Sequence, residues 1–345
     1  MNKSVWLSLI LGALFLSLAF WGMDFTALGK ALEGANYIWL VPAYGVMFGL
    51  TCLRSWRLQF ILRRTRNLPF WQMFVVNAIG FAAINLLPAR LGEFMRPYLL
   101  LERNDVPLGA GLASILVERL FDFLAMVVMV FCVALFVDLP SDSVTVFGQT
   151  LPIIDVGRQL AIFLALPALG FVAALFLFEK YMTHLMEKVA RAILPEAIAH
   201  KVIDLIASFL LAMSQIRDPR VALGITLWTA AIWFFNPLAQ LSILHAFGLD
   251  LGYQGAIAIL ACTLMGLLIP APPGFAGNFE AFTLAGLLLF GITGEGALAY
   301  ALVGHSVQFL STVGFGLICL WKVGITSDKL VEAFRTRGGM KPGGN

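Results

Sequence analysis

Charged residues occur at three places within or beside long apolar stretches of this sequence. They lie in the segments NLLPARLGEFMR at 85–96, VERLFD at 117–122 and PAPPGFAGNFE at 270–280. A charge at the centre of a bilayer costs about 2.5–3.5 kcal/mol on insertion scales, so such residues usually pair with one another or face a polar cavity. Carboxylates and guanidinium groups in such positions can bind a charged headgroup or relay protons.

The first group surrounds a proline that interrupts an apolar run. Its polar and helix-breaking residues are Asn85, Pro88, Arg90, Gly92, Glu93 and Arg96. A helix that breaks inside a bilayer frees backbone groups, which need partners in the protein or in a water-filled cavity. A short helix beginning near Gly92 places Glu93 and Arg96 on one face, because they are three residues apart. The alternative is a solvated cytoplasmic loop.

The second group, Glu118, Arg119 and Asp122, lies inside the apolar run 110–137. At a rise of 1.5 Å per residue, Glu118 lies roughly 12 Å along a helix that starts near residue 110. Glu118 and Asp122 share a face, and Arg119 can reach Asp122 at i,i+3 spacing. The group is either part of a transport pathway or an ion-pair staple between helices, and the two roles are compatible.

The third group combines helix breakers with polar residues: Pro270, Pro273, Gly274, Gly277, Asn278 and Glu280. The prolines end one half-helix, and the glycines allow a tight turn before the next. The N-terminus of a half-helix presents free N–H groups, which suit a phosphate, although Glu280 could instead cap that end itself. His305 lies in the apolar stretch ALVGHSVQFL. It is either part of this site or a hydrogen-bonded core histidine.

The composition excludes a soluble globular protein. Of 345 residues, 60% are hydrophobic and only 12% are charged, whereas soluble domains carry about 25% charged residues. The four cysteines fall in separate apolar runs without CxxC spacing, and the sequence has no HExxH motif. We therefore expect a polytopic membrane protein with no metal site, no cofactor and no nucleic-acid partner.

A membrane-crossing helix needs about 20 apolar residues. Six stretches are long enough to cross: 4–22, 37–53, 110–137, 158–178, 221–247 and 296–321. The segment 54–66 contains five arginines and no acid, and basic residues also follow Trp321, which places both on the cytoplasmic side. The segment 138–157 has three acids and no base, so it is expected outside.

With the loops assigned to these sides of the membrane, the six spans already account for every crossing of the chain. The two remaining apolar stretches therefore cannot cross it. Residues 70–107 and 255–292 must therefore form re-entrant hairpins that enter from opposite sides. The predicted fold is an all-α polytopic domain over 1–322, with about six full spans and a possible inverted repeat. An amphipathic cytoplasmic segment is expected over 179–218, a disordered cytoplasmic tail over 323–345, and a cytoplasmic N-terminus.

The three groups together resemble a known family. The pattern N-x-x-P-x-R-x-G-E-x-x-R is matched by Asn85, Pro88, Arg90, Gly92, Glu93 and Arg96. E-R-x-x-D is matched by Glu118, Arg119 and Asp122. P-x-x-P-G-x-x-G-x-x-E is matched by Pro270, Pro273, Gly274, Gly277 and Glu280. Over nearly its whole length the chain is similar to the lysylphosphatidylglycerol synthase transmembrane region, the flippase-like domain of UPF0104-type membrane proteins.

The resemblance implies lipid handling at a central cavity where two re-entrant hairpins meet. No synthase domain follows residue 322, so lipid synthesis is not expected of this chain. Phe275 stands where the family often has a second glycine, and His305 stands near a common arginine, so the headgroup cannot be carried over from the family.

We therefore expect a lipid transporter of the cytoplasmic membrane, not an enzyme, whose partners are lipids with anionic or zwitterionic headgroups. Arg90, Arg96 and Arg119 would bind the headgroup anion, and the nearby carboxylates would pair with them in the empty state. A homodimer or a separate lipid-synthesising enzyme is a possible partner. The alternatives are a membrane-embedded transferase on a lipid-phosphate carrier, and a non-transporting subunit of an envelope-lipid synthesis complex.

Overall fold

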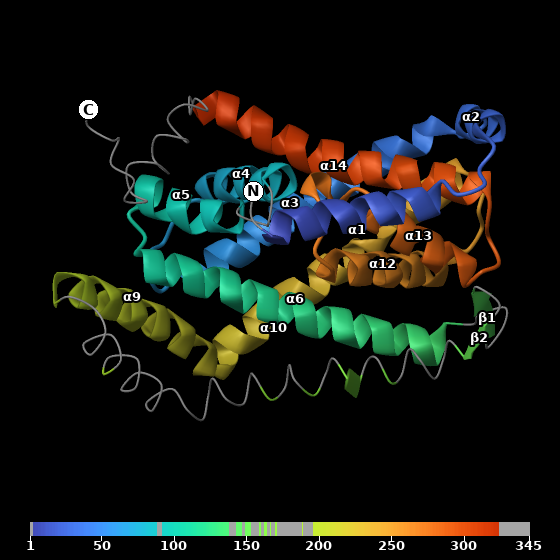
Figure 1. The fold of residues 1–345 in the computed structure, drawn as a ribbon. Coiled ribbons are helices and arrows are strands. Elements are labelled where there is room, and N and C mark those ends of the chain that lie inside the picture. The colour runs from blue at the N-terminus through green and yellow to red at the C-terminus, as the bar shows by residue number, and fades with distance from the viewer. Residues whose placement is uncertain are drawn as a thin grey trace.

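The computed structural model describes residues 3–87, 92–137, 143–146, 149–152 and 196–323, with isolated positions between 159 and 188. The apolar segments are helical, and one short antiparallel β-hairpin, β1 (Ser143–Val146) and β2 (Gln149–Pro152), follows residue 137. The α-helices are α1 (Lys3–Ala19), α2 (Phe25–Glu33), α3 (Leu40–Leu62), α4 (Phe70–Leu86), α5 (Met95–Asn104), α6 (Leu108–Phe136), α9 (Glu196–Ser214), α10 (Pro219–Phe235), α11 (Pro237–Ala246), α12 (Gly252–Leu268), α13 (Asn278–Leu288) and α14 (Glu295–Val323). Figure 1 shows these helices running mainly along one axis of the molecule.

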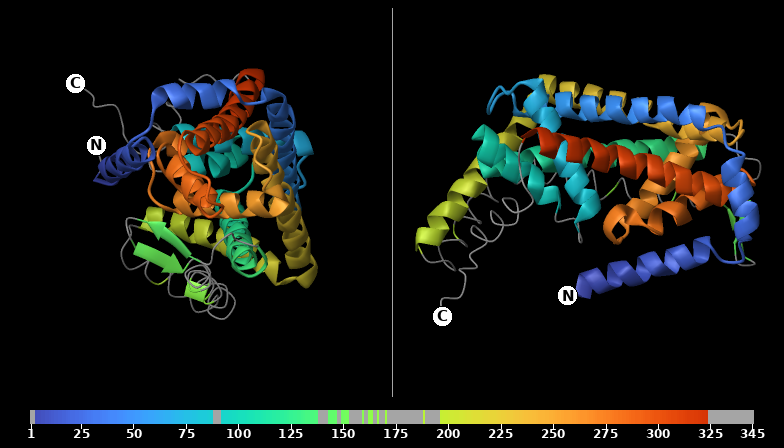
Figure 2. Two further views of the ribbon diagram at one scale, coloured as in Figure 1. Left: turned by 90° about the vertical axis from the view of Figure 1, so that its right-hand side faces the viewer. Right: turned by 90° about the horizontal axis from the view of Figure 1, so that it is seen from above.

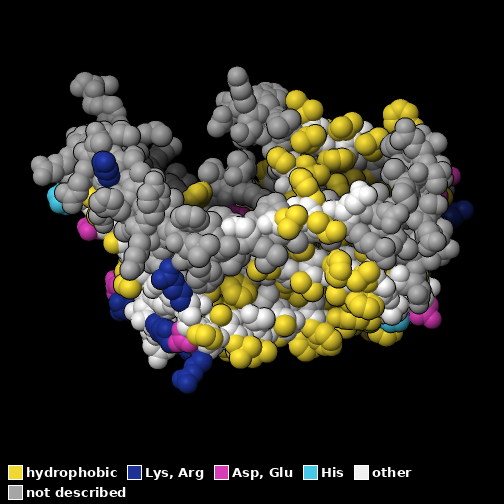
Figure 3. Space-filling view, turned by 90° about the horizontal axis from the view of Figure 1, so that it is seen from below, with side chains coloured by type: hydrophobic (Ala, Val, Ile, Leu, Met, Phe, Trp, Pro, Cys, Tyr) yellow, Lys and Arg dark blue, Asp and Glu magenta, His cyan; other side chains and the backbone are white. Residues whose placement is uncertain are grey.

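Four stretches are long and apolar enough to cross a membrane: Tyr37–Leu62, Leu108–Phe136, Pro219–Ala246 and Glu295–Val323. They confirm four of the six predicted spans. The predicted span at 4–22 corresponds to α1, a shorter helix, and the span at 158–178 lies almost entirely outside the described residues. Between 28% and 33% of each spanning window is buried inside the protein, so most residues of each window keep at least part of their surface accessible. In Figure 3 apolar side chains cover the middle of one face, and charged side chains gather toward the ends.

Other predicted segments also fall outside the description. These are residues 324–345, which contain nearly all of the expected disordered tail, and most of 179–195 in the expected amphipathic segment. The rest of that segment is α9 together with the short turn Gln215–Arg217.

Helix α3 is longer than predicted. The expected span ended at residue 53, but α3 continues to Leu62, which places Arg54 and Arg57 inside the helix and not in a cytoplasmic loop. The side chain of Arg57 is 1% exposed. The helix continues because Arg54 and Arg57 contact carboxylate and aromatic side chains on neighbouring helices. A hydropathy profile contains no information on such contacts, so it predicted an earlier end.

The two helix breaks are confirmed. Helix α4 ends at Leu86 and α5 begins at Met95, whereas α12 ends at Leu268 and α13 begins at Asn278. The pair α4–α5 lies toward one end of the molecule and the pair α12–α13 toward the other, in both Figure 1 and the right-hand view of Figure 2. The second break turns at Gly274 and Gly277, whose φ angles of 75° and 87° suit glycine. A short 3-10 turn, Pro273–Phe275, packs against α4, so the two hairpins meet inside the molecule.

Two apolar clusters hold the hairpins in place. The cluster around the first hairpin includes Leu58, Met73, Ile79, Leu99 and Leu100. The cluster around the second includes Leu50, Ile243, Ile259, Leu287 and Tyr300. Helix α3 contributes to both, because its N-terminal half packs on one cluster and its C-terminal half on the other.

The span at 219–246 is interrupted at Asn236, where α10 ends and α11 begins with Pro237. Proline has no N–H to continue the helical ladder, so a bend at this position is expected.

Helix α1 packs against the second hairpin. A side chain at Gly12 would lie 2.5 Å from Pro272, and one at Gly277 would lie 2.2 Å from the Gly12 carbonyl oxygen. Glycine on both sides therefore allows the two backbones to approach closely.

Candidate functional site: a cavity between the two hairpins

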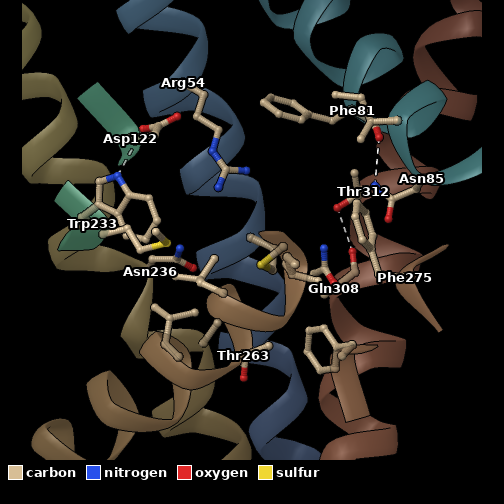
Figure 4. A pocket seen from close by; sticks show the side chains of 18 of the residues that line it. Arg54, Phe81, Asn85, Asp122, Trp233, Asn236, Thr263, Phe275, Gln308 and Thr312 are labelled. Atoms are coloured by element: carbon tan, nitrogen blue, oxygen red, sulfur yellow. Dashed lines mark hydrogen bonds between the residues drawn. The ribbon is translucent and has the colours of Figure 1, made fainter. Parts of the chain in front are cut away.

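A cavity of about 670 Å³ lies between the two hairpins and is lined by residues of α3, α4, α6, α10 to α14 and both helix breaks. Most of its wall is apolar and includes Met126, Leu264, Phe275 and Phe279. Its polar side chains include Arg54, Asn85, Glu93, Arg119, Asp122, Asn236, Gln240 and Gln308. Figure 4 shows several of these polar groups directed into the cavity. Pockets for small ligands usually have volumes of about 300–1,000 Å³.

One wall of the cavity is built on a bidentate ion pair between α3 and α6. The guanidinium of Arg57 donates to both carboxylate oxygens of Asp122, with N–O distances of 2.6 and 2.9 Å. It also donates to Thr229 at 3.0 Å, and the Trp233 indole donates to Asp122 at 3.1 Å. Asp122 therefore accepts three hydrogen bonds, which hold its carboxylate in one orientation at the cavity surface.

A second buried pair continues this row of charges. Arg96 on α5 and Glu118 on α6 form an ion pair with an N–O distance of 2.6 Å, and both side chains are at most 3% exposed. Glu118 also lies 3.7 Å from the Nε of Arg57. Arg96, Glu118, Arg57 and Asp122 therefore alternate in sign across three helices. Neither Arg96 nor Glu118 lines the cavity, so this ion pair serves to hold α5 against α6.

Arg119 pairs with Glu93 at the first helix break, at an N–O distance of 3.8 Å. The side chains are 40% and 29% exposed, and both line the cavity. Although their spacing would allow Arg119 to reach Asp122, the structure pairs Asp122 with Arg57 on another helix. The Glu93–Arg119 pair is long and accessible, so a ligand in the cavity can reach both groups.

Arg54 points into the cavity between Asp122 and Phe81 (Figure 4). Its guanidinium carbon lies 5.1 Å from the centre of the Phe81 ring, within the range of a cation–π contact. It forms no ion pair with any carboxylate that the structure describes, since Glu93, Glu118 and Asp122 are paired with other arginines. Among described residues this region contains four arginines (54, 57, 96 and 119) against three acids, a net charge of +1 carried by Arg54.

The second hairpin carries a pair of its own. Glu280 accepts a hydrogen bond from the Gly277 N–H at 2.7 Å, so it caps α13 as the alternative interpretation held. Its other oxygen lies 2.6 Å from Nδ1 of His305. Asn278 is fully buried and donates to the Gly266 carbonyl at the end of α12. None of these three side chains lines the cavity.

The structure thus divides the predicted site residues. Asn85, Glu93, Arg119 and Asp122 line the cavity; Arg96, Glu118, Asn278, Glu280 and His305 lie behind its wall. Pro88 and Arg90 fall outside the described residues. Sequence reasoning missed Arg54 and Arg57. Their i,i+3 spacing at the end of an apolar run was the available signal, but the arginines that follow at 63, 64 and 66 made the whole segment resemble a basic loop.

The contact between Arg96 and α4 can be tested with a single methyl group. A Cβ atom at Gly80 would lie 2.1 Å from Cγ of Arg96, whose side chain is buried and paired. Gly80→Ala is therefore expected to lower the free energy of unfolding by about 1–3 kcal/mol, measured by thermal unfolding in detergent micelles. Gly45→Ala on α3, where nothing lies within 4 Å of the new methyl group, is the matched control. It is expected to leave stability unchanged or raise it by up to about 1 kcal/mol, and an equal effect of both variants would contradict the packing argument.

The described residues contain no group of three or more His, Cys, Asp or Glu side chains that could hold a metal ion. The polar side chains that line the cavity include arginines, carboxylates and amides, which can bind anions and cations and move protons.

Comparison with known proteins agrees with the three sequence patterns. Residues 5–316 match the lysylphosphatidylglycerol synthase TM region. A UPF0104 membrane protein of Methanocaldococcus jannaschii is 27% identical over 240 residues, which cover 69% of this chain and 93% of that protein. A second UPF0104 membrane protein, from Methanothermobacter thermautotrophicus, is 24% identical over 322 residues, which cover 88% of this chain and 89% of that protein.

A further relative is a longer protein. The glycosyltransferase AglD of Haloferax volcanii is 27% identical over 318 residues, which cover 85% of this chain but only 50% of AglD. The chain thus spans about half the length of AglD. Because the family match extends over nearly all of its residues, this multi-pass membrane protein belongs to the lysylphosphatidylglycerol synthase TM region family.

Proposed function

We propose that this protein moves lipids with an anionic headgroup between the leaflets of the cytoplasmic membrane. The observation that carries the proposal is the guanidinium of Arg54, which faces a largely apolar cavity without a carboxylate partner among the described residues. The four described arginines of this region outnumber its three acids, so an anion that brings a negative charge into the cavity is stabilised there.

The cavity is suited to a lipid because its polar and apolar walls adjoin. Arg54 and Arg119 offer donors to a phosphate, and Leu264, Leu267 and Phe275 offer an apolar surface to the first part of an acyl chain. The Glu93–Arg119 pair can open toward a ligand, since it is long and partly exposed. When no lipid is bound, Glu93 compensates the positive charge of Arg119.

We further propose that α4–α5 and α12–α13 are re-entrant hairpins of an inverted repeat, with the N- and C-termini in the cytoplasm. Each hairpin is followed by a long helix, α6 or α14, that carries a basic side chain facing the carboxylate at the break. Glu93 pairs with Arg119, 26 residues later, and Glu280 pairs with His305, 25 residues later. Pairs at corresponding places in two oppositely placed hairpins support alternating access, in which each hairpin opens the cavity toward one leaflet.

The proposal is tested with purified protein in lipid vesicles. Fluorescent analogues of phosphatidylglycerol and of an uncharged diacylglycerol are incorporated, and a membrane-impermeant quencher reports the fraction in the outer leaflet over time. We expect the protein to accelerate the exchange of the phosphatidylglycerol analogue and to leave the uncharged analogue at the rate of protein-free vesicles. Equal rates with and without protein for the anionic analogue would rule the proposal out.

A second candidate is a membrane-embedded transferase that acts on a lipid-phosphate carrier, favoured by the likeness to AglD, which is named a glycosyltransferase. Asp122 is poorly suited to act as its general base, because its oxygens already accept bonds from Arg57 and Trp233. Glu93 is the better candidate. Mass spectrometry of lipids from cells with and without the protein distinguishes the two: a transferase changes the mass of a lipid, whereas a transporter changes only its leaflet.

A further inference from the structure

The second hairpin holds a histidine whose two ring nitrogens both face oxygen atoms. Nδ1 of His305 lies 2.6 Å from Oε1 of Glu280, and Nε2 lies 2.6 Å from the Gly274 carbonyl oxygen. A carbonyl oxygen only accepts hydrogen bonds, and a neutral imidazole has only one N–H. The two contacts therefore require one proton more than a neutral histidine and a carboxylate contain together. The extra proton lies on the imidazole or on Oε1 of Glu280.

The rest of the environment offers this proton no other titratable partner among the described residues. The His305 ring stacks on Phe279, with centroids 4.7 Å apart, and its edge contacts Phe309. Glu280 is the one ionisable residue of α13, and α4, which packs along α14, has none. His245, the one titratable residue of α11, packs against Trp39, with ring centroids 4.8 Å apart. Of the remaining helices packed on α14, α2 carries Lys30 and Glu33 but packs around Leu298 and Ala299, near the start of α14. Helix α3 directs Arg54 and Arg57 to the first group of charges.

Loss of the extra proton would disturb the turn at the hairpin tip. With Nδ1–H donated to the carboxylate, Nε2 would present a lone pair to the Gly274 carbonyl oxygen at 2.6 Å, which is repulsive. Gly274 and Phe275 both have positive φ, 75° and 61°, and Phe275 lines the cavity. A non-glycine residue in this conformation persists only where its surroundings hold it. The contact from His305 to Gly274 is one such restraint.

The corresponding pair of the first hairpin cannot respond in this way. There Glu93 faces Arg119, and a guanidinium stays protonated in proteins. The two hairpins thus differ in one chemical property: the second pair contains an imidazole, a group that can gain and lose a proton, and the first contains a guanidinium, which does not.

We propose that Glu280 and His305 form a proton-binding site that controls the hairpin tip and, through Phe275, the headgroup cavity. With the proton bound, both contacts of His305 hold the Gly274–Phe275 turn against the cavity. When the proton leaves to water, through the 13% of the His305 side chain that is exposed, the turn is released and the second hairpin can move. The coupling to transport rests on the proposed function, whereas the proton site itself does not.

The proton site is tested directly by ¹⁵N NMR of the full-length protein, labelled at histidine, in lipid nanodiscs. The His305 signals are identified by their loss in His305→Gln. Near neutral pH we expect the wild type to show Nε2 carrying a hydrogen and Nδ1 sharing a second one with Glu280. As the pH rises to about 9 we expect one of these two hydrogens to be lost. A ring with one free nitrogen at every pH, or one that keeps both hydrogens throughout, would overturn the proposal. Glu280→Gln is expected to move the transition to lower pH.

The coupling is tested in the vesicle assay over the range from about pH 5 to pH 9. We expect exchange of the phosphatidylglycerol analogue to slow at least about fivefold toward low pH in the wild type and in the control His245→Gln. In His305→Arg, which keeps a fixed positive charge as at residue 119, the remaining rate should not depend on pH.

Exchange that is independent of pH in the wild type would refute the coupling but not the proposed lipid transport. Absence of exchange at every pH would refute the proposed function and with it the coupling, and the NMR result would still decide the proton site.

Discussion

Replacement of Arg57 by glutamine is expected to lower the free energy of unfolding by about 3–5 kcal/mol, the usual cost of removing one partner of a buried ion pair. Arg57 compensates the charge of Asp122 through two hydrogen bonds and also lies beside Glu118. A glutamine cannot supply the charge, so Asp122 would lose its counterion. Equilibrium unfolding in detergent micelles, followed by circular dichroism, measures the effect.

Two control variants separate the ion pair from a general loss of packing. Arg57→Leu combined with Asp122→Leu removes both charges and is expected to recover most of the lost stability, because an apolar pair can replace a buried ion pair at little cost. Arg66→Gln removes a surface arginine that lies 3.4 Å from Asp105 and should change stability by less than about 1 kcal/mol. If Arg57→Gln is as stable as Arg66→Gln, the row of alternating charges does not hold α3 to α6.

Replacement of Arg54 by glutamine is expected to leave stability nearly unchanged and to slow lipid exchange. The side chain lines the cavity and has no ion-pair partner among the described residues, so its loss should hardly change the unfolding free energy. A hydrogen bond to a charged group contributes about 1.5–3 kcal/mol, and 1.4 kcal/mol is a factor of ten. Exchange of the phosphatidylglycerol analogue should therefore slow about 10- to 100-fold in the vesicle assay.

Arg66→Gln again serves as the matched control, since it removes the same charge outside the cavity. Arg54→Lys should keep part of the rate, because lysine retains the charge but not the planar pair of donors. A normal rate in Arg54→Gln, with exchange by the wild type intact, would mean that Arg54 does not bind the headgroup.

The helices and their breaks were predictable because each depends on local sequence. Apolar length indicated Leu108–Phe136 and Glu295–Val323 as spans. Proline and glycine marked the breaks before Met95 and Asn278, since these residues interrupt the helical ladder wherever they occur. Charge bias and parity predict that the two hairpins enter from opposite sides of the membrane, and that orientation stays a prediction.

The pairing of the charges was not predictable in the same way. Asp122 has Arg119 three residues before it, but its partner is Arg57, 65 residues earlier in the chain. Which arginine reaches a carboxylate depends on how α3 and α6 cross, and one sequence does not contain that information. For the same reason Arg54 was assigned to a loop, although it is the cation left over once the other pairs have formed.

The close approach of Gly12 to Gly277 has a consequence for the order in which the chain assembles. The two residues are 265 positions apart (277 − 12), and at about 5–20 residues per second the ribosome needs roughly 10–50 s to make that length. During this time the hairpin on which α1 packs has not yet been made. Helix α1 is therefore made long before its contacts with the second hairpin can form, and another surface has to cover its face toward Gly277 until translation reaches that hairpin.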